Sequence, residues 1–289
     1  MGLFISLSVG DGVRQYWRLI RGEHGVLTAI SSVASYLIAG GRSPLTSALV
    51  GISAFLAEAG MFAHNDVANL QEDRINRPDA PLVAGSVSLG AAKAVAVASY
   101  LSGLALASLL TWQALAVYVA AASLGAFYNE RGKRIPFVGN FIVAFLTSMV
   151  YPYGMAAAGA VDAYLALLFA ASLLANFGRE LVKTAIDYRG DLAAGMRTAA
   201  MVLGPERAAG LGAYFALASS AVGAYLSYAL ASSGMYVLLA GVALTTALLV
   251  VLSVLCIDGE WQLFRRGSLA AFGATLVALL AQGVIVAIF

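Results

Sequence analysis

Apolar residues dominate the chain in long runs separated by short polar segments. The runs are longer than a membrane β-strand and lack the strict alternation of a barrel. A bilayer core about 30 Å thick is instead crossed by roughly 20 apolar residues in a helix. The pattern therefore predicts nine transmembrane helices in one all-α membrane domain, residues 1–289, with spans near 25–41, 44–66, 89–111, 113–128, 137–159, 162–186, 207–231, 234–256 and 268–288.

Composition excludes an ordinary soluble globule, because 61% of the 289 residues are hydrophobic, 11% are charged and the mean hydropathy is +0.86. The single cysteine, Cys256, has no partner for an intrachain disulfide. His24 and His64 are too far apart in sequence for a zinc site, and we expect both at the membrane interface. A net charge of +2 does not favour a nucleic-acid partner, and the sequence shows no obligatory protein partner.

The basic residues are distributed unevenly between the two sides of the predicted helices. Of the 17 lysines and arginines, all but Arg42 fall on the side of the N-terminus. Because cytoplasmic loops carry the excess of positive charge, this predicts a cytoplasmic N-terminus in a multi-pass cell-membrane protein. The segment "VRQYWRLIRGEHG" mixes arginines with Tyr16 and Trp17, which is typical of a helix lying in the interface.

Polar side chains interrupt the end of the second predicted span, at "NDVANLQEDRINRPDAPLVAG". Asp66, Asn69 and Asp73 stand at i, i+3 and i+7, and Asn65, Asn69 and Asp73 at i, i+4 and i+8. In a helix this spacing places their oxygens on one stripe at the cytoplasmic end. Glu58 lies two turns deeper on the same face as Asp66. Its carboxylate has either a structural hydrogen bond or a place in an acceptor pocket.

A second acidic stripe ends the sixth predicted span, at "RELVKTAIDYRGD", where Glu180, Lys183, Asp187 and Asp191 stand at i, i+3, i+7 and i+11. Charged residues at the ends of membrane helices are usually only solvated. Two matched stripes on one membrane face favour function, because clustered carboxylates near hydrocarbon need cations. Oxygen ligands without Cys or His suit Mg²⁺ shared with a phosphate-bearing substrate.

Three segments resemble the motifs of the UbiA superfamily of intramembrane prenyltransferases. The first acidic stretch resembles its NDxxDxxxD motif, and "RELVKTAIDYRGDLAAGMRTAAMVLG" resembles its second motif. "FYNERGKRIPFVGNFIVAFLTSMVYPYG" is similar to the stretch between them. The resemblance implies nine helices around a central cavity, and Mg²⁺-dependent transfer of an isoprenoid chain from its diphosphate to an acceptor. One departure is Asn69, which stands where the family carries an aspartate.

The resemblance also implies roles for individual residues. Catalysis is expected from Asp66, Asp73, Asp187 and Asp191. The metal ligands are expected to be Asp66, Asn69, Asp73, Asp187 and Asp191. Substrate binding is expected at Asn65, Asn69, Arg74, Arg77, Lys133, Lys183 and Arg197.

Within the superfamily, the segments are most similar to the archaeal branch that adds a second geranylgeranyl chain to geranylgeranylglyceryl phosphate in ether-lipid biosynthesis. The expected partners are a prenyl diphosphate, a small phosphorylated or aromatic acceptor and membrane lipids. One alternative is a 4-hydroxybenzoate-type polyprenyltransferase of quinone biosynthesis. Another is a transporter that uses the acids as a cation site, although transporter sites usually lie near the bilayer midplane.

Overall fold

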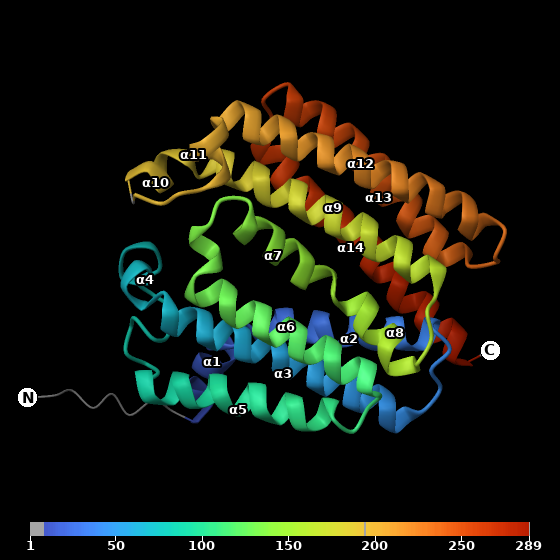
Figure 1. Cartoon of the computed structure of the whole chain (residues 1–289), viewed down its shortest axis with the longest axis horizontal. Helices are drawn as coiled ribbons and strands as arrows, with labels where there is room; N and C mark the ends of the chain where they lie inside the picture. Colours follow the sequence, from blue (N-terminus) through green and yellow to red (C-terminus); the bar gives the residue numbers. More distant parts are fainter. Residues whose placement is uncertain (1–8, 194, 289) are drawn as a thin grey trace, which may run out of the picture.

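The computed structural model describes residues 9–193 and 195–288, and its regular elements in these ranges are all helical (Figure 1). The elements are α1 (Val9–Leu19), α2 (Gly22–Ile38), α3 (Pro44–Ala68), α4 (Leu70–Asn76), α5 (Leu89–Ala107), α6 (Trp112–Glu130), η1 (Gly132–Arg134), α7 (Val138–Ser148), α8 (Val150–Ala158), α9 (Ala163–Ile186), α10 (Tyr188–Ala193), α11 (Ala199–Leu203), α12 (Pro205–Ala231), α13 (Tyr236–Ile257) and α14 (Trp261–Ile288). The all-α prediction is confirmed.

Within residues 9–193 and 195–288, six helices are long and apolar enough to cross a membrane: α3, α5, α9, α12, α13 and α14. The bent pair of α7 and α8 makes a seventh candidate. The other two predicted spans coincide with α2, which has 17 residues, and α6, which has 19. The structure therefore supports six or seven spans, and the total of nine stays a prediction.

The predicted span at 137–159 is not one straight helix. It divides at Met149 into α7 and α8, whose axes are bent by 42°. Pro152 explains the break, because proline has no N–H for the carbonyl four residues earlier and its ring crowds that carbonyl. The "YPYG" segment serves packing, since Tyr151 and Tyr153 are both buried in apolar clusters.

Side-chain caps fix where the long helices begin. Ser43, Ser88, Thr111 and Asp162 precede α3, α5, α6 and α9, and each accepts a hydrogen bond from a backbone N–H in the first turn. Short polar side chains at this position satisfy N–H groups that have no partner within the helix. The acidic motifs lie at the opposite ends of α3 and α9.

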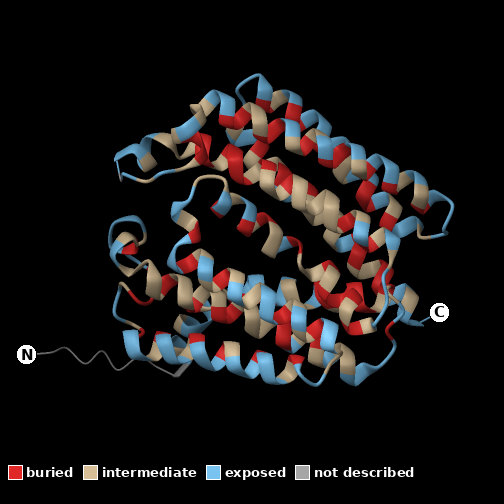
Figure 2. Cartoon of the chain, viewed as in Figure 1, coloured by how far each residue is buried: buried red, intermediate tan, exposed pale blue. Residues whose placement is uncertain are grey.

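Glycines allow a close contact between backbones where α9 crosses α12. A Cβ atom on Gly178 would lie 2.4 Å from the carbonyl oxygen of Gly212, and one on Gly212 would lie 2.5 Å from that of Gly178. The two backbones therefore touch directly. Large apolar side chains such as Leu101 of α5 and Val251 of α13 are exposed, as expected for surfaces that meet lipid. Figure 2 shows exposed residues along much of the outermost helices.

Candidate active site

The two acidic motifs lie at the same end of the molecule. Figure 1 shows α4 and α10, the short helices that continue the motifs, at one end of the long helices. The first stripe does not follow one continuous helix, because α3 ends at Ala68 and α4 begins at Leu70. The backbone N–H of Asp73 still donates to the carbonyl of Asn69 at 2.8 Å. The break therefore leaves the spacing of the stripe largely intact.

Asp66 is the most enclosed acid of the first motif, with 1% of its surface exposed. Its Oδ1 accepts hydrogen bonds from Arg21 at 3.3 Å and from Arg77 at 3.2 Å. Its Oδ2 is buried and has no hydrogen-bond partner among the described residues. Because buried polar atoms are normally paired, this oxygen is suited to a cation or to a donor on a ligand.

Arg21 is a residue of the site that the sequence reasoning missed. It occupies the left-handed region at φ 47° between α1 and α2, and its guanidinium lies 4.2 Å from the centre of the Phe62 ring. Non-glycine residues rarely adopt this backbone conformation, which the surrounding contacts hold in place here. The sequence counted Arg21 only as an interfacial charge, and no local signal points to its contact with Asp66.

Asp73 is buried beside Asp66, and its Oδ2 lies 3.5 Å from a guanidinium nitrogen of Arg77. Burial raises the pKa of the Asp73 carboxyl, and the charge of Arg77 opposes the shift. The site thus already contains two positive side chains, Arg21 and Arg77, against two acids.

Lys133 approaches the first motif from η1. Its ammonium group donates hydrogen bonds to Asn69 Oδ1 and to Glu72, the latter at 2.7 Å. Arg134 also reaches Glu72, at 3.4 Å. The structure thus places Lys133 beside the first motif, its role in binding substrate stays a prediction, and the part of Glu72 in holding it was not foreseen.

Asn65 is fixed by α6 rather than by its own helix. Its amide donates to Asn129 Oδ1 at 2.8 Å, and Asn129 donates in turn to the carbonyl of Met61 at 3.0 Å. The side-chain oxygen of Asn65, Oδ1, makes no hydrogen bond to another described side chain. It can therefore accept a hydrogen bond from a ligand.

The second motif is more open. Asp187 ends α9 and keeps 42% of its side chain exposed, and Asp191 lies on α10. Arg265 of α14 approaches Asp187 to 3.9 Å. Burial and the neighbouring charge of Asp187 both raise the pKa of the Asp191 carboxyl. The charge of Lys183 opposes this shift at Asp191, and Arg265 is the cation nearest to Asp187 among the described ion pairs.

Glu180, on the same stripe, is buried and has two cationic neighbours. Its carboxylate lies 3.5 Å from Arg179 and 3.7 Å from Lys183. Lys183 is therefore shared with Glu180 in this structure. Tyr128 of α6 interacts electrostatically with Glu180 and with Arg21, so α6 lies between the two motifs.

Two predicted substrate-binding residues are not brought into the site. Arg74 is exposed and donates to Gln71 at 3.2 Å. Arg197 is exposed, and no ion pair forms to it within residues 9–193 and 195–288. His64 lies outside the acidic pairs and bonds Glu130 at 2.8 Å.

The residues fit magnesium better than a closed structural metal site. In the described part of the chain, no three His, Cys, Asp or Glu side chains converge on a metal position. The acids instead form two pairs, Asp66 with Asp73 and Asp187 with Asp191. Mg²⁺ is typically held by one or two carboxylates, with waters and substrate phosphates completing its octahedron. The unpartnered Asp66 Oδ2 is consistent with such a site.

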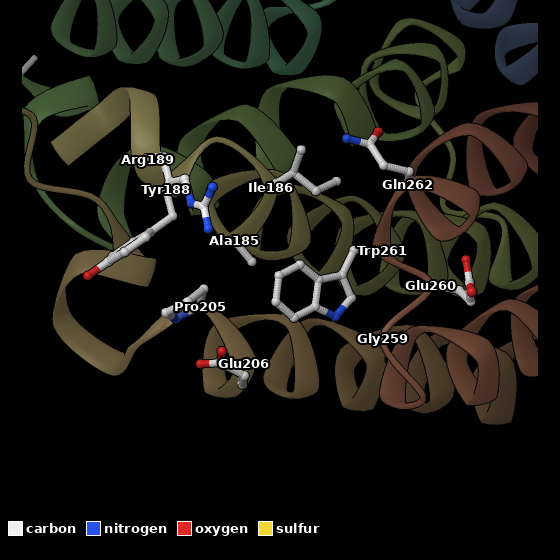
Figure 3. Close-up of a pocket in the computed structure, with 10 residues that line it drawn as sticks. All are labelled: Ala185, Ile186, Tyr188, Arg189, Pro205, Glu206, Gly259, Glu260, Trp261 and Gln262. Carbon is white, nitrogen blue, oxygen red and sulfur yellow. The ribbon is translucent and has the colours of Figure 1, made fainter. Parts of the chain in front are cut away.

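A cavity of about 390 Å³ lies between the junction of α9 and α10, the start of α12 and the start of α14. It is distinct from the acidic pairs. Figure 3 shows Ile186, Arg189 and Trp261 around it, with Pro205 and Glu206 from the start of α12. None of the four motif aspartates lines it. Arg189 of α10 therefore lines this cavity, apart from the four motif aspartates.

Comparison with known proteins gives consistent matches. The model of the UbiA prenyltransferase family matches residues 27–285. Digeranylgeranylglyceryl phosphate synthase of Methanoculleus marisnigri is 39% identical over 215 residues, covering 74% of this chain and 76% of the relative. The enzyme of the same name from Methanopyrus kandleri is 32% identical over 264 residues, covering 91% and 96%.

Solved structures share the fold. A structure reported for digeranylgeranylglyceryl phosphate synthase has a TM-score of 0.80 at 24% identity, covering 95% of this chain and 99% of its own. A UbiA homologue from Archaeoglobus fulgidus bound to GPP and Mg²⁺ has a TM-score of 0.74 at 19% identity, covering 95% and 100%. Since the family model spans most of the chain and the relatives exceed 30% identity, this protein belongs to the UbiA prenyltransferase family, as its motifs indicated.

Proposed function

We propose that this prenyltransferase moves a geranylgeranyl group from its diphosphate to the free hydroxyl of geranylgeranylglyceryl phosphate in ether-lipid biosynthesis. The relatives that carry the name of this activity support the acceptor. The observation that supports the site is the buried Asp66 carboxylate, held by Arg21 and Arg77 with one oxygen unpartnered. A carboxylate surrounded by cations suits the joint binding of a metal ion and a diphosphate.

Different residues would bind the metal ion and the phosphate groups of the diphosphate. Mg²⁺ would be held by Asp66, Asn69 and Asp73 and by Asp187 and Asp191. The Mg²⁺ bound to the archaeal homologue of the same fold supports a divalent metal, and the choice of ligands rests on the acidic motifs. When bound, Mg²⁺ would stabilise the negative charge that the diphosphate gains as its carbon–oxygen bond breaks.

The side chains around the metal ligands would orient and neutralise the phosphates. Arg21 and Arg77 present guanidinium groups at Asp66, and Lys133 brings a third cation from η1. Arginine can bind phosphate oxygens as a fork, and lysine as a point charge. The apolar helices behind the motif exclude water from the allylic cation, while the prenyl tail stays in the bilayer.

The acceptor separates this proposal from its alternative. A 4-hydroxybenzoate-type enzyme would hold the carboxylate of an aromatic acid, whereas geranylgeranylglyceryl phosphate brings a phosphate and a second hydrocarbon chain. A transporter is disfavoured, because the acidic pairs lie at one end of the long helices (Figure 1) and the chain belongs to a prenyltransferase family.

Purified protein incubated with radiolabelled geranylgeranyl diphosphate and each acceptor would test the proposal. We expect labelled product with geranylgeranylglyceryl phosphate, none with 4-hydroxybenzoate, and loss of product when EDTA removes Mg²⁺. Asp79→Asn is a matched control, because Asp79 is an exposed acid paired with Arg18 outside the site. Product with 4-hydroxybenzoate alone would contradict the proposed acceptor.

We also propose that the N-terminus and the acidic motifs face the cytoplasm, as the distribution of basic residues indicates. In a Cys256→Ala background, an impermeant maleimide should reach Ile75→Cys and Leu192→Cys only from the cytoplasmic side. Val161→Cys is the control for the opposite face. All three native side chains are exposed, and Val161 lies at the other end of α9 from the motif. Labelling of positions 75 and 192 only from outside would reverse the orientation.

A further inference from the structure

Glu58 is an acid within a membrane helix that the proposed site does not use. Of the 15 acidic residues, it alone lies more than two turns from both ends of its helix. It is only half-buried, yet it forms no hydrogen bond or ion pair with another residue of the described ranges. An unpaired carboxylate at this depth is unfavourable, so it calls for a functional explanation.

The neighbours of Glu58 on α3 show where its side chain points. Phe62, one turn on and on the same face, packs against Arg21 and, at 5.5 Å between ring centres, against His24 at the start of α2. Asn65, two turns on, bonds Asn129 of α6. The opposite face of α3, at Gly60, contacts Tyr100 of α5. Glu58 therefore lies near the face of α3 that carries Phe62 and Asn65, and its carboxyl interacts electrostatically with Arg21 and with the Tyr100 hydroxyl of α5.

The depth of Glu58 matches the expected path of the prenyl donor. Eight residues separate it from Asp66, which at 1.5 Å per residue is about 12 Å along the helix. A diphosphate held at Asp66 extends its hydrocarbon chain away from the cytoplasmic end, toward Glu58. Arg21 interacts electrostatically with both carboxyl groups and so lies between the two levels. The reacting carbon then falls between Asp66 and Glu58.

We propose that Glu58 is the catalytic base that takes the proton from the acceptor hydroxyl, an inference that rests on the proposed function. The bond between the first prenyl carbon and the diphosphate oxygen breaks, and its electron pair leaves with the diphosphate. A lone pair on the acceptor oxygen forms the new ether bond to that carbon. The hydroxyl proton passes to the Glu58 carboxylate and then to water, which restores the base.

A thiol acceptor separates this role from a structural one. Glu58→Gln keeps the size of the side chain but removes the basic oxygen. We would compare geranylgeranylglyceryl phosphate with an analogue that carries a thiol in place of the reacting hydroxyl. A thiol has a pKa of about 8.5 and loses its proton at mildly alkaline pH without help from a base. With the hydroxyl acceptor we expect the kcat of Glu58→Gln to fall at least ~100-fold. With the thiol acceptor at the same alkaline pH, its kcat should stay close to wild type.

Two outcomes would overturn the inference: retained transfer to the hydroxyl acceptor, or equal loss with both acceptors. Ser53→Ala is the matched control on the same helix, since Ser53 is buried and shares a 2.6 Å hydrogen bond with Tyr153. We expect it to lower the thermal midpoint without separating the acceptors. Wild-type protein that uses neither glycerol acceptor would contradict the proposed function itself, whereas equal losses in Glu58→Gln alone would contradict only the role of Glu58.

Discussion

The two acidic motifs share a plan but differ in how completely they are assembled. Each lies where a long helix ends and a short one follows, α3 with α4 and α9 with α10. Asp66 is 1% exposed and held by two arginines, whereas 42% of the Asp187 side chain is exposed and its single cationic neighbour among the described residues is 3.9 Å away. The first motif is thus held by more contacts from the chain itself than the second.

The difference arises from how many segments converge. Arg21 comes from the junction of α1 and α2, Lys133 from η1, and Arg77 from the end of α4. Among the described residues, the second motif receives Arg265 from α14, and Lys183 of its own helix interacts electrostatically with Asp191. Since a preorganised site loses less conformational freedom on binding, we infer that the first motif contributes more to diphosphate affinity than the second.

The largest effects are expected from the aspartates. Alanine at Asp66, Asp73, Asp187 or Asp191 should each lower turnover at least ~100-fold, because a truncated ligand no longer supports the charge of the leaving group. Asp66→Ala should also lower the thermal midpoint in detergent, since it leaves Arg21 and Arg77 without their shared partner. Asp187→Ala should leave the midpoint near wild type. Near-normal turnover in any two of the four variants would show that the motifs are only solvated helix ends.

Substitution of the two lysines should have smaller effects than substitution of the aspartates, and the two effects on the donor KM should differ. Lys133 is 9% exposed and contacts the first motif, so Lys133→Gln should raise the donor KM about tenfold, which corresponds to ~1.4 kcal/mol. Lys183 is 43% exposed and shared with Glu180, and Lys183→Gln should change the donor KM less. Steady-state kinetics at saturating Mg²⁺ measures both. If the donor KM rises more in Lys183→Gln than in Lys133→Gln, the second motif contributes more to donor binding than the first.

A negative charge introduced at position 69 should change the Mg²⁺ concentration that the enzyme needs. Asn69→Asp places a carboxylate beside Lys133 and on the stripe with Asp66, and we expect the half-saturating Mg²⁺ concentration to fall. Asn69→Leu should lower activity, because it removes an oxygen ligand. Titration of Mg²⁺ against initial rate measures these effects. If the half-saturating concentration rises in Asn69→Asp, repulsion from Asp66 dominates and direct ligation by residue 69 is refuted.

The smallest effect is expected at Arg265. Its ion pair with Asp187 is long and partly exposed, and such pairs contribute little to stability. Arg265→Gln should therefore leave the thermal midpoint unchanged and lower the half-saturating Mg²⁺ concentration about twofold, because the arginine no longer competes for Asp187. A large loss of kcat would instead give Arg265 a direct part in binding substrate.

Helix positions were predictable because the bilayer imposes a length and an apolar composition on each span. Each of the nine predicted ranges coincides with a helix or with the α7–α8 pair. The motif acids were predictable for a similar reason, since carboxylates are rare in such segments. Pro152 was a readable signal for the break at Met149 that the hydrophobic pattern alone did not reveal.

Contacts across the chain were not predictable in the same way. Arg21 and Asp66 are 45 positions apart, and their contact depends on a left-handed residue between two helices. The sequence likewise placed Arg74 beside the substrate, but its side chain turns to Gln71 at the surface. Charge and spacing identify which residue types gather at one end of a helix, and tertiary packing decides which of them face inward.

The direct backbone contact between α9 and α12 has a consequence for mutation. A side chain at Gly178 or Gly212 would wedge the two helices apart. Asp187 lies nine residues after Gly178 on the same helix, so that displacement would change its separation from the first motif. Under the proposed function, the distance that one diphosphate would have to bridge between the two acidic pairs thus depends on two residues that have no side chain.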